Sequence, residues 1–277
     1  MLPFAVCLIF LARGWLTWRF DSPVRELIWE EDLWSRFLPW FGTDWATFAR
    51  TSDSWIRPTL DVLGITLMAL AIVPWLAVFI RLAWLRWWLL PGTIILILDA
   101  VSRWISKDMQ LGMALEYLLQ VATPLALFIW LGRQEKKSSG ASSAPVFWLL
   151  LAATAATFIG HGLYASGYYP PPLEFRMMTT EILPLSESNA LIFLKIVGWL
   201  DFVVVLLLLI PRVRRVALVY MICWGSLTTL ARLAAYFSLD LPLYGLDPWL
   251  AEALVRTPHW LIPLWLLQRS SADKLRL

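Results

Sequence analysis

The chain has 277 residues, of which 60% are hydrophobic and 16% are charged, and its formal net charge is +3. Soluble globular domains carry about a quarter of charged residues, so this composition excludes an ordinary soluble domain and indicates an integral membrane protein. The predicted fold class is all-α: a polytopic transmembrane helical protein in the lipid bilayer.

Eight stretches are long enough to cross the membrane, because a helix needs about 20 residues to span a hydrocarbon core about 30 Å thick. Many of the 19 tryptophans lie near the predicted ends, as is typical of residues in the headgroup layer. The first stretch has no basic residue before it and is interrupted by Arg13, so we expect it to be retained and not cleaved as a signal peptide. Pro258 and Pro263 interrupt the last one. The predicted spans are residues 2–18, 58–80, 87–105, 113–131, 146–165, 190–210, 213–237 and 251–268.

Residues 21–57 are the one substantial segment expected outside the membrane. Ser22 and Pro23 form a cap and first-turn proline, and apolar residues then recur at roughly helical spacing. Thr43 and Asp44 predict the start of a second short helix. We expect two amphipathic surface helices, which cap their own bundle, rest in the headgroups or dock on another membrane subunit.

Loop charge predicts the orientation. Arg and Lys dominate every second loop, and most acidic residues lie in the loops between them. By the positive-inside rule, both termini and the linker at residues 133–145 are predicted to be cytoplasmic, in a bacterial inner (plasma) membrane. These basic loops also account for the positive net charge, so no nucleic-acid partner is predicted.

The sequences on the two sides of the linker resemble each other, as expected for an internal repeat of one membrane unit. Residues 114–124 align with residues 253–263, and Arg13-Gly14 falls near His161-Gly162. Because corresponding spans would run in the same direction, we expect a duplicated four-helix bundle. The predicted units are residues 1–132, which include the surface helices, and residues 146–277, joined by the linker at residues 133–145.

Ionisable residues inside the spans are the most informative polar groups. A charge at the centre of a membrane helix costs at least about 2.5 kcal/mol, so such groups are expected to pair or to line a wet cavity. Asp99 and Arg103 are four residues apart and are predicted to form a structural ion pair on one helix face. Lys195 and Asp201 are six residues apart, point to different faces and need partners on other helices.

His161, Asp201 and Arg232 lie in the outer parts of three different spans of the second unit and have no obvious partner on their own helices. We expect them to converge on one polar pocket that opens to the outer side. Lys195 and His259 are further candidate ligand-binding residues of this pocket.

No catalytic residues and no metal site are predicted, since the chain has no Cys/His cluster and no H-E-x-x-H motif. The two histidines, His161 and His259, raise the hypothesis of haem ligation between two imidazoles. Nothing in their spacing requires haem, so it is disfavoured. The candidate ligands are a quinone or a lipid.

Residues 160–164, Gly-His-Gly-Leu-Tyr, and residues 198–201, Gly-Trp-Leu-Asp, are followed by an apolar run and a basic hinge at Arg212. Over residues 158–236 this pattern resembles the DoxX-like family of four-span bacterial membrane proteins. The first half departs from it, with Arg13 in place of the histidine and Asp61 preceding Gly64 in reversed order. The resemblance implies a bundle that binds a lipid-like molecule or serves as a subunit, since members are linked with quinone-coupled sulfur oxidation or membrane oxidoreductase complexes.

Two functions remain open. The first is an accessory or scaffolding subunit of a larger bacterial membrane complex, fastened through its apolar faces and through residues 21–57. The alternative is a quinone-binding subunit of an oxidoreductase, in which His161 and Asp201 exchange protons and hydrogen bonds with the quinone head group. The chain has no redox ligand set, so another chain would supply the electrons, and we do not expect an enzyme that acts on its own.

Overall fold

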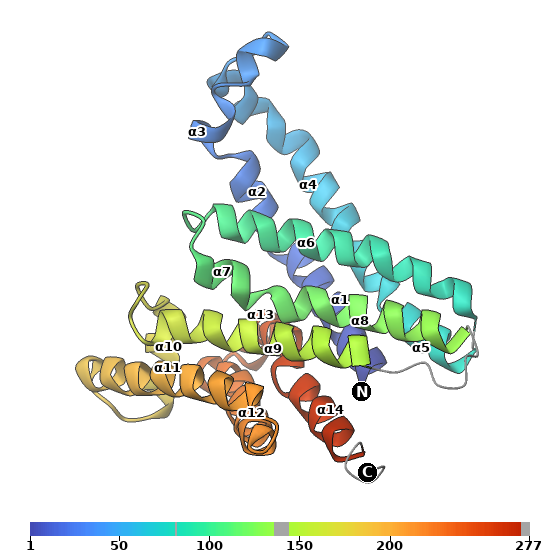
Figure 1. Ribbon diagram of the computed structural model, residues 1–277. Coiled ribbons are helices and arrows are strands. Elements are labelled where there is room, and N and C mark those ends of the chain that lie inside the picture. The colour runs from blue at the N-terminus through green and yellow to red at the C-terminus, as the bar shows by residue number, and fades with distance from the viewer. Residues whose placement is uncertain (81, 136–143, 273–277) are drawn as a thin grey trace.

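A computed structural model describes residues 1–80, 82–135 and 144–272. Within these ranges every regular element is a helix, and seven helical segments are long and apolar enough to cross a bilayer (Figure 1). Large apolar side chains such as Ile94, Leu206 and Val216 are 63–66% exposed, as expected for helices that face lipid. The predicted all-α polytopic class is confirmed.

The first half contains four long helical segments. They are α1 (Leu2–Arg19), α4 (Trp45–Leu70) with its extension α5 (Val73–Phe79), α6 (Leu89–Ile105) preceded by the 3-10 helix η2 (Ala83–Trp88), and α7 (Leu111–Glu116) followed by α8 (Leu118–Glu135).

The second half adds three long helices and two shorter ones. The long helices are α9 (Ala144–Ala165), α11 (Glu187–Leu209) and α12 (Arg214–Tyr236). The predicted last span is divided into α13 (Pro242–Val255) and α14 (Pro258–Ala272), helices of 14 and 15 residues. Pro258 has no backbone N–H to continue α13, so it begins a new helix. Residues 136–143 of the predicted linker lie outside the described part of the chain.

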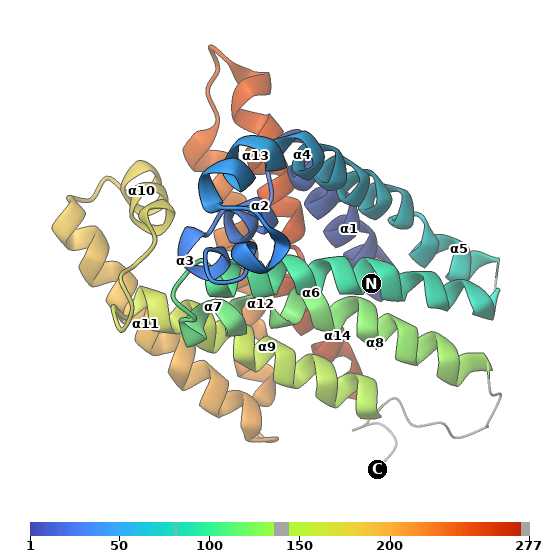
Figure 2. The same ribbon diagram turned by 90° about the horizontal axis from the view of Figure 1, so that it is seen from above.

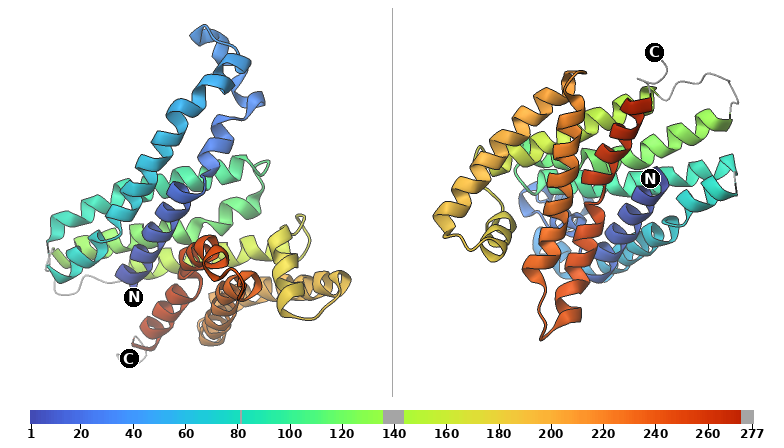
Figure 3. Two further views of the ribbon diagram at one scale, coloured as in Figure 1. Left: turned by 180° about the vertical axis from the view of Figure 1, so that it is seen from behind. Right: turned by 90° about the horizontal axis from the view of Figure 1, so that it is seen from below.

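The helix neighbours follow the same order in both halves. In the first half α1 and α6 each pack against α4 and α8. In the second half α9 and α12 each pack against α11 and α14. Figure 2 shows α5 of the first half and α11 of the second at opposite sides of the molecule. The halves meet where α9 packs on α7 and α8, and where α1 packs on α13 and α14, as Figure 3 shows from two further sides.

Glycines bring the first two long helices of each half into close contact. A Cβ added at Gly64 of α4 would lie 2.8 Å from the backbone oxygen of Gly14 in α1. A Cβ added at Gly198 of α11 would lie 2.8 Å from the backbone carbonyl carbon of Ala165 in α9. At both junctions the helix backbones approach closely because neither glycine has a side chain.

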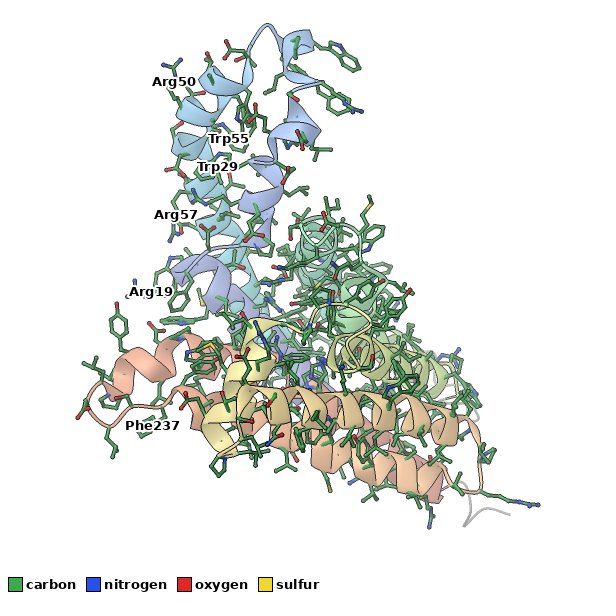
Figure 4. The ribbon with its side chains drawn as sticks, turned by 90° about the vertical axis from the view of Figure 1, so that its left-hand side faces the viewer. Arg19, Trp29, Arg50, Trp55, Arg57 and Phe237 are labelled. Carbon is green, nitrogen blue, oxygen red and sulfur yellow. The ribbon has the colours of Figure 1, made fainter. Side chains whose placement is uncertain are left out.

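The segment at residues 21–57 forms a hairpin whose tip projects beyond the other helices, while its base packs on α6 (Figure 4), and we call it the protrusion. It contains α2 (Pro23–Ile28), α3 (Glu31–Trp34), η1 (Leu38–Phe41) and the first turns of α4. Trp29 Nε1 donates to Ser52 Oγ at 2.8 Å, and Arg25 pairs with Asp53, so α2 is fastened to α4. The labelled side chains of Trp29 and Trp55 both lie on it in Figure 4.

The second predicted surface helix, which starts after Thr43 and Asp44, is not a separate element. Asp44 begins a helix as predicted, since its carboxylate accepts from the Thr47 backbone N–H at 2.7 Å, which lowers its pKa. That helix is α4 itself, which continues through Pro58 into the membrane span. One proline removes only one backbone donor, so a helix can continue past it, as α4 does at Pro58.

Candidate ligand-binding cavity

A cavity of about 510 Å³ lies within the second half. It is bounded by α9, α11, α12, the α13–α14 junction and α10 (Leu173–Ile182), a short helix that the sequence analysis did not predict. Leu227 and Leu230 of α12 line the cavity and are 60% and 58% exposed. The mouth of the cavity therefore lies beside the exposed surface of α12. Most of the remaining wall is apolar and includes Phe158, Phe175, Met178, Phe193, Val197 and Trp224.

Four of the five candidate residues meet at this cavity: His161, Asp201, Arg232 and His259 all line it. The four side chains therefore surround one space, and their binding role stays a prediction. Lys195 does not line the cavity. It is exposed beside the turn at Gly167, because it projects from a different face of α11 than Asp201 does.

Asp201 is held by a residue that sequence reasoning did not single out. Its side chain is 1% exposed and accepts a hydrogen bond from the Tyr220 hydroxyl of α12 at 3.0 Å. Among the described residues no cation forms an ion pair with it. Tyr220 could not be found from helical spacing, because it lies on another helix.

The two histidines of the cavity touch each other. The ring centroids of His161 and His259 are 5.2 Å apart in an edge-to-face arrangement. This direct contact leaves no space between the imidazoles for a porphyrin. His259 Nε2 is buried and has no hydrogen-bond partner among the described residues, so it is available to a ligand.

Beside the cavity, a buried charge cluster joins the helices of the first half. The predicted Asp99–Arg103 pair is present, with Arg103 Nε donating to Asp99 Oδ2 at 3.1 Å. Arg13 Nε lies 3.5 Å from the same oxygen, and Arg13 Nη2 donates to Gln120 Oε1 at 3.0 Å. The ring of Tyr117 lies within 5.7 Å of both guanidiniums. Asp99 is therefore the counterion of two arginines, Arg13 and Arg103.

Arg256 connects the cluster to the cavity. It lines the cavity, forms an ion pair with Glu252 one turn before it, and its Nη2 lies 3.8 Å from Glu116 Oε1 of the first half. Four residues separate Glu116 from Gln120, which is the spacing of neighbours on one face of an unbroken helix. The helix breaks at Tyr117, so Glu116 faces Arg256 while Gln120 faces Arg13.

Arg232 is the exception among these arginines. Its side chain is buried at 5% exposure, and within the described ranges it has no ion pair. Its Nε has no hydrogen-bond partner in the described part of the chain. The cavity thus combines a long apolar wall with a cationic, histidine-bearing end.

Within the described residues no group of three or more His, Cys, Asp or Glu side chains is placed to hold a metal ion. The arrangement suits noncovalent binding of a molecule that is apolar along most of its length and polar at one end. No protein-family model matches the chain, no curated protein matches it, and no solved structure matches it. The resemblance to the DoxX-like family stays a prediction.

Proposed function

We propose that this chain is a non-catalytic membrane subunit whose second half holds a membrane amphiphile, a lipid or a quinone. The proposal that it binds an amphiphile rests on the cavity in the second half. Its volume of about 510 Å³ lies within the range of roughly 300–1,000 Å³ that is usual for ligand pockets. Its mouth between Leu227 and Leu230 is bordered by side chains exposed to lipid, so a chain could enter from the bilayer.

Extraction of bound molecules tests this proposal. The protein is purified in mild detergent, and extracted lipids and quinones are measured by mass spectrometry. Ala231→Trp fills the cavity from α12, and Ala152→Trp adds the same side chain at an exposed site of α9. Bound amphiphile should fall several-fold in Ala231→Trp alone. An unchanged amount would contradict the proposal.

A quinone remains the alternative ligand. If the extracted molecule is a quinone, Asp201→Asn or His161→Ala should abolish its recovery while the protein remains folded, because both residues line the cavity. Electrons would come from another chain of an oxidoreductase in the bacterial inner membrane. Loss of protein yield without loss of quinone would instead assign these residues a structural role.

Attachment to a larger complex is the second part of the proposal, and the protrusion favours it. Trp40 and Phe41 are each 78% exposed at its tip, although large aromatic side chains are normally covered. We expect the double change of Trp40→Ser and Phe41→Ser to shift the chain from a larger assembly to its own size in native electrophoresis of solubilised membranes. Unchanged migration would argue against docking through this tip.

A further inference from the structure

We propose that the amphiphile carries an anionic head group, a phosphate or a carboxylate, which pairs with Arg232. This inference rests on the proposed binding function and specifies the chemical class of the ligand. It implies that a neutral quinone is not the preferred occupant.

Within the described residues Arg232 forms no ion pair, and Glu252 and Glu116 act on its charge only from a longer distance. Arg13 and Arg103 share Asp99, and Arg256 is placed between Glu252 and Glu116. Asp201 lines the same cavity, but it is bonded to Tyr220 and is not within ion-pair distance of Arg232. Three of the four guanidiniums are therefore paired with Asp99, Glu116 or Glu252, whereas Arg232, which lines the cavity, has no ion-pair partner in the described part of the chain.

An unpaired charge at this depth is unfavourable unless something balances it. A charged side chain within the membrane costs at least about 2.5 kcal/mol on insertion scales. A phosphate or carboxylate would balance the charge through two parallel hydrogen bonds to the planar guanidinium. A quinone carbonyl could accept one hydrogen bond and would leave the charge unneutralised.

Two neighbouring groups fit the same head group. His259 Nε2 is buried and has no hydrogen-bond partner in the ranges that the structure describes, and Arg256 also lines the cavity. His161 lies against His259 at the same end. The two imidazoles and the Arg256 guanidinium supply further hydrogen-bonding capacity around one anion.

The rest of the cavity fits an apolar chain. α10 contributes Phe175 and Met178, while α12 contributes Leu227 and Leu230 near the mouth. An amphiphile with its anion at Arg232 would therefore lay its chain between α10 and α12, toward the lipid-exposed surface.

Native mass spectrometry of the delipidated full chain in detergent tests the inference. The probes are palmitoyl-oleoyl phosphatidic acid and the matching diacylglycerol, which lacks only the phosphate. We expect the wild type to retain phosphatidic acid at least about tenfold better than diacylglycerol. Arg232→Gln should remove that preference, and Arg232→Lys should keep part of it.

The control is Arg215→Gln, an exposed arginine near the start of the same helix, which should leave the preference unchanged. If Arg232→Gln does not accumulate as folded protein, the wild type and Arg232→Lys still test the inference. The preference for phosphatidic acid over diacylglycerol is measured in both of them. A further arm adds millimolar inorganic phosphate. Release of the lipid by free phosphate would overturn a lipid head group in favour of a soluble anion.

Failure of this inference can be told apart from failure of the proposed function. Equal retention of both lipids, or stronger retention of ubiquinone, together with loss in Ala231→Trp, would overturn the anionic head group and leave the cavity as a binding site. Retention of no probe at all would overturn both.

Discussion

Asp99 is the most connected buried carboxylate of the first half. It is 4% exposed and faces both Arg13 and Arg103. Removing one partner of a buried ion pair leaves an uncompensated charge, and here two guanidiniums would lose their counterion together.

We expect Asp99→Asn to destabilise the protein by about 3–5 kcal/mol. The control is Asp61→Asn, which breaks the half-exposed pair of Asp61 with Arg57 and should cost at most about 1 kcal/mol. Thermal unfolding in detergent, followed by tryptophan fluorescence, measures both. Equal losses in the two variants would refute the assigned role of Asp99.

Residue-level reasoning from the sequence reached part of the site. His161, Asp201, Arg232 and His259 could be selected because ionisable groups in a span need a partner or a cavity. Tyr220 and the contact of Glu116 with Arg256 could not, because both contacts join different helices and depend on how those helices pack. The pair of Glu252 with Arg256 differs, because its spacing of four residues can be read from the sequence.

At the scale of elements, two glycine contacts set how closely the first two long helices of each half approach. Glycine inside a helix normally costs about 0.5–1 kcal/mol relative to alanine, so Gly→Ala at an open site is stabilising. At Gly64 and Gly198 the added Cβ would meet backbone atoms of the partner helix, which cannot move aside alone.

Gly198→Ala and Gly64→Ala should therefore each destabilise the protein by about 1–3 kcal/mol, although alanine has a higher helix propensity than glycine. Ala152→Gly, at an exposed position of α9, measures the propensity effect alone. Thermal unfolding in detergent reports all three. Stabilisation by either alanine would show that the helices do not meet at that glycine.

Element boundaries were predictable where length and hydropathy decide them. Residues 146–165 and 213–237 lie close to α9 and α12. The sequence indicated the break at Pro258, which interrupts the last predicted span, but it did not indicate the break at Tyr117 or the short helix α10. The latter two depend on contacts with distant residues, such as that of α10 with α12, which periodicity does not report.

At the scale of the molecule, we propose that the two halves arose by duplication. α7 ends at Glu116 and α13 ends at Val255, positions that the sequence comparison places together. The neighbour order is also the same, and the halves exchange equivalent contacts, α1 with α13 and α14 and α9 with α7 and α8. An experimental structure in which the halves cannot be superposed in helix order would refute the duplication.

Membrane orientation is a separate prediction. With Cys7 and Cys223 replaced by serine, Ser35→Cys on the protrusion should react with an impermeant maleimide in intact cells, because that segment is predicted to lie outside. Gln134→Cys should react only after permeabilisation, because the end of α8 is predicted to be cytoplasmic. Labelling of Gln134→Cys in intact cells would reverse the orientation.

The central claim, that the second half holds a membrane amphiphile, is tested most directly by photo-crosslinking in lipid. A fatty acid that carries a diazirine near the end of its chain is added to the reconstituted protein, and the modified peptides are identified by mass spectrometry. The account predicts adducts on α10 and on the cavity face of α12, competed by unlabelled fatty acid and lost in Ala231→Trp. Adducts confined to lipid-facing residues such as Ile94 and Leu206, and unchanged in Ala231→Trp, would contradict it.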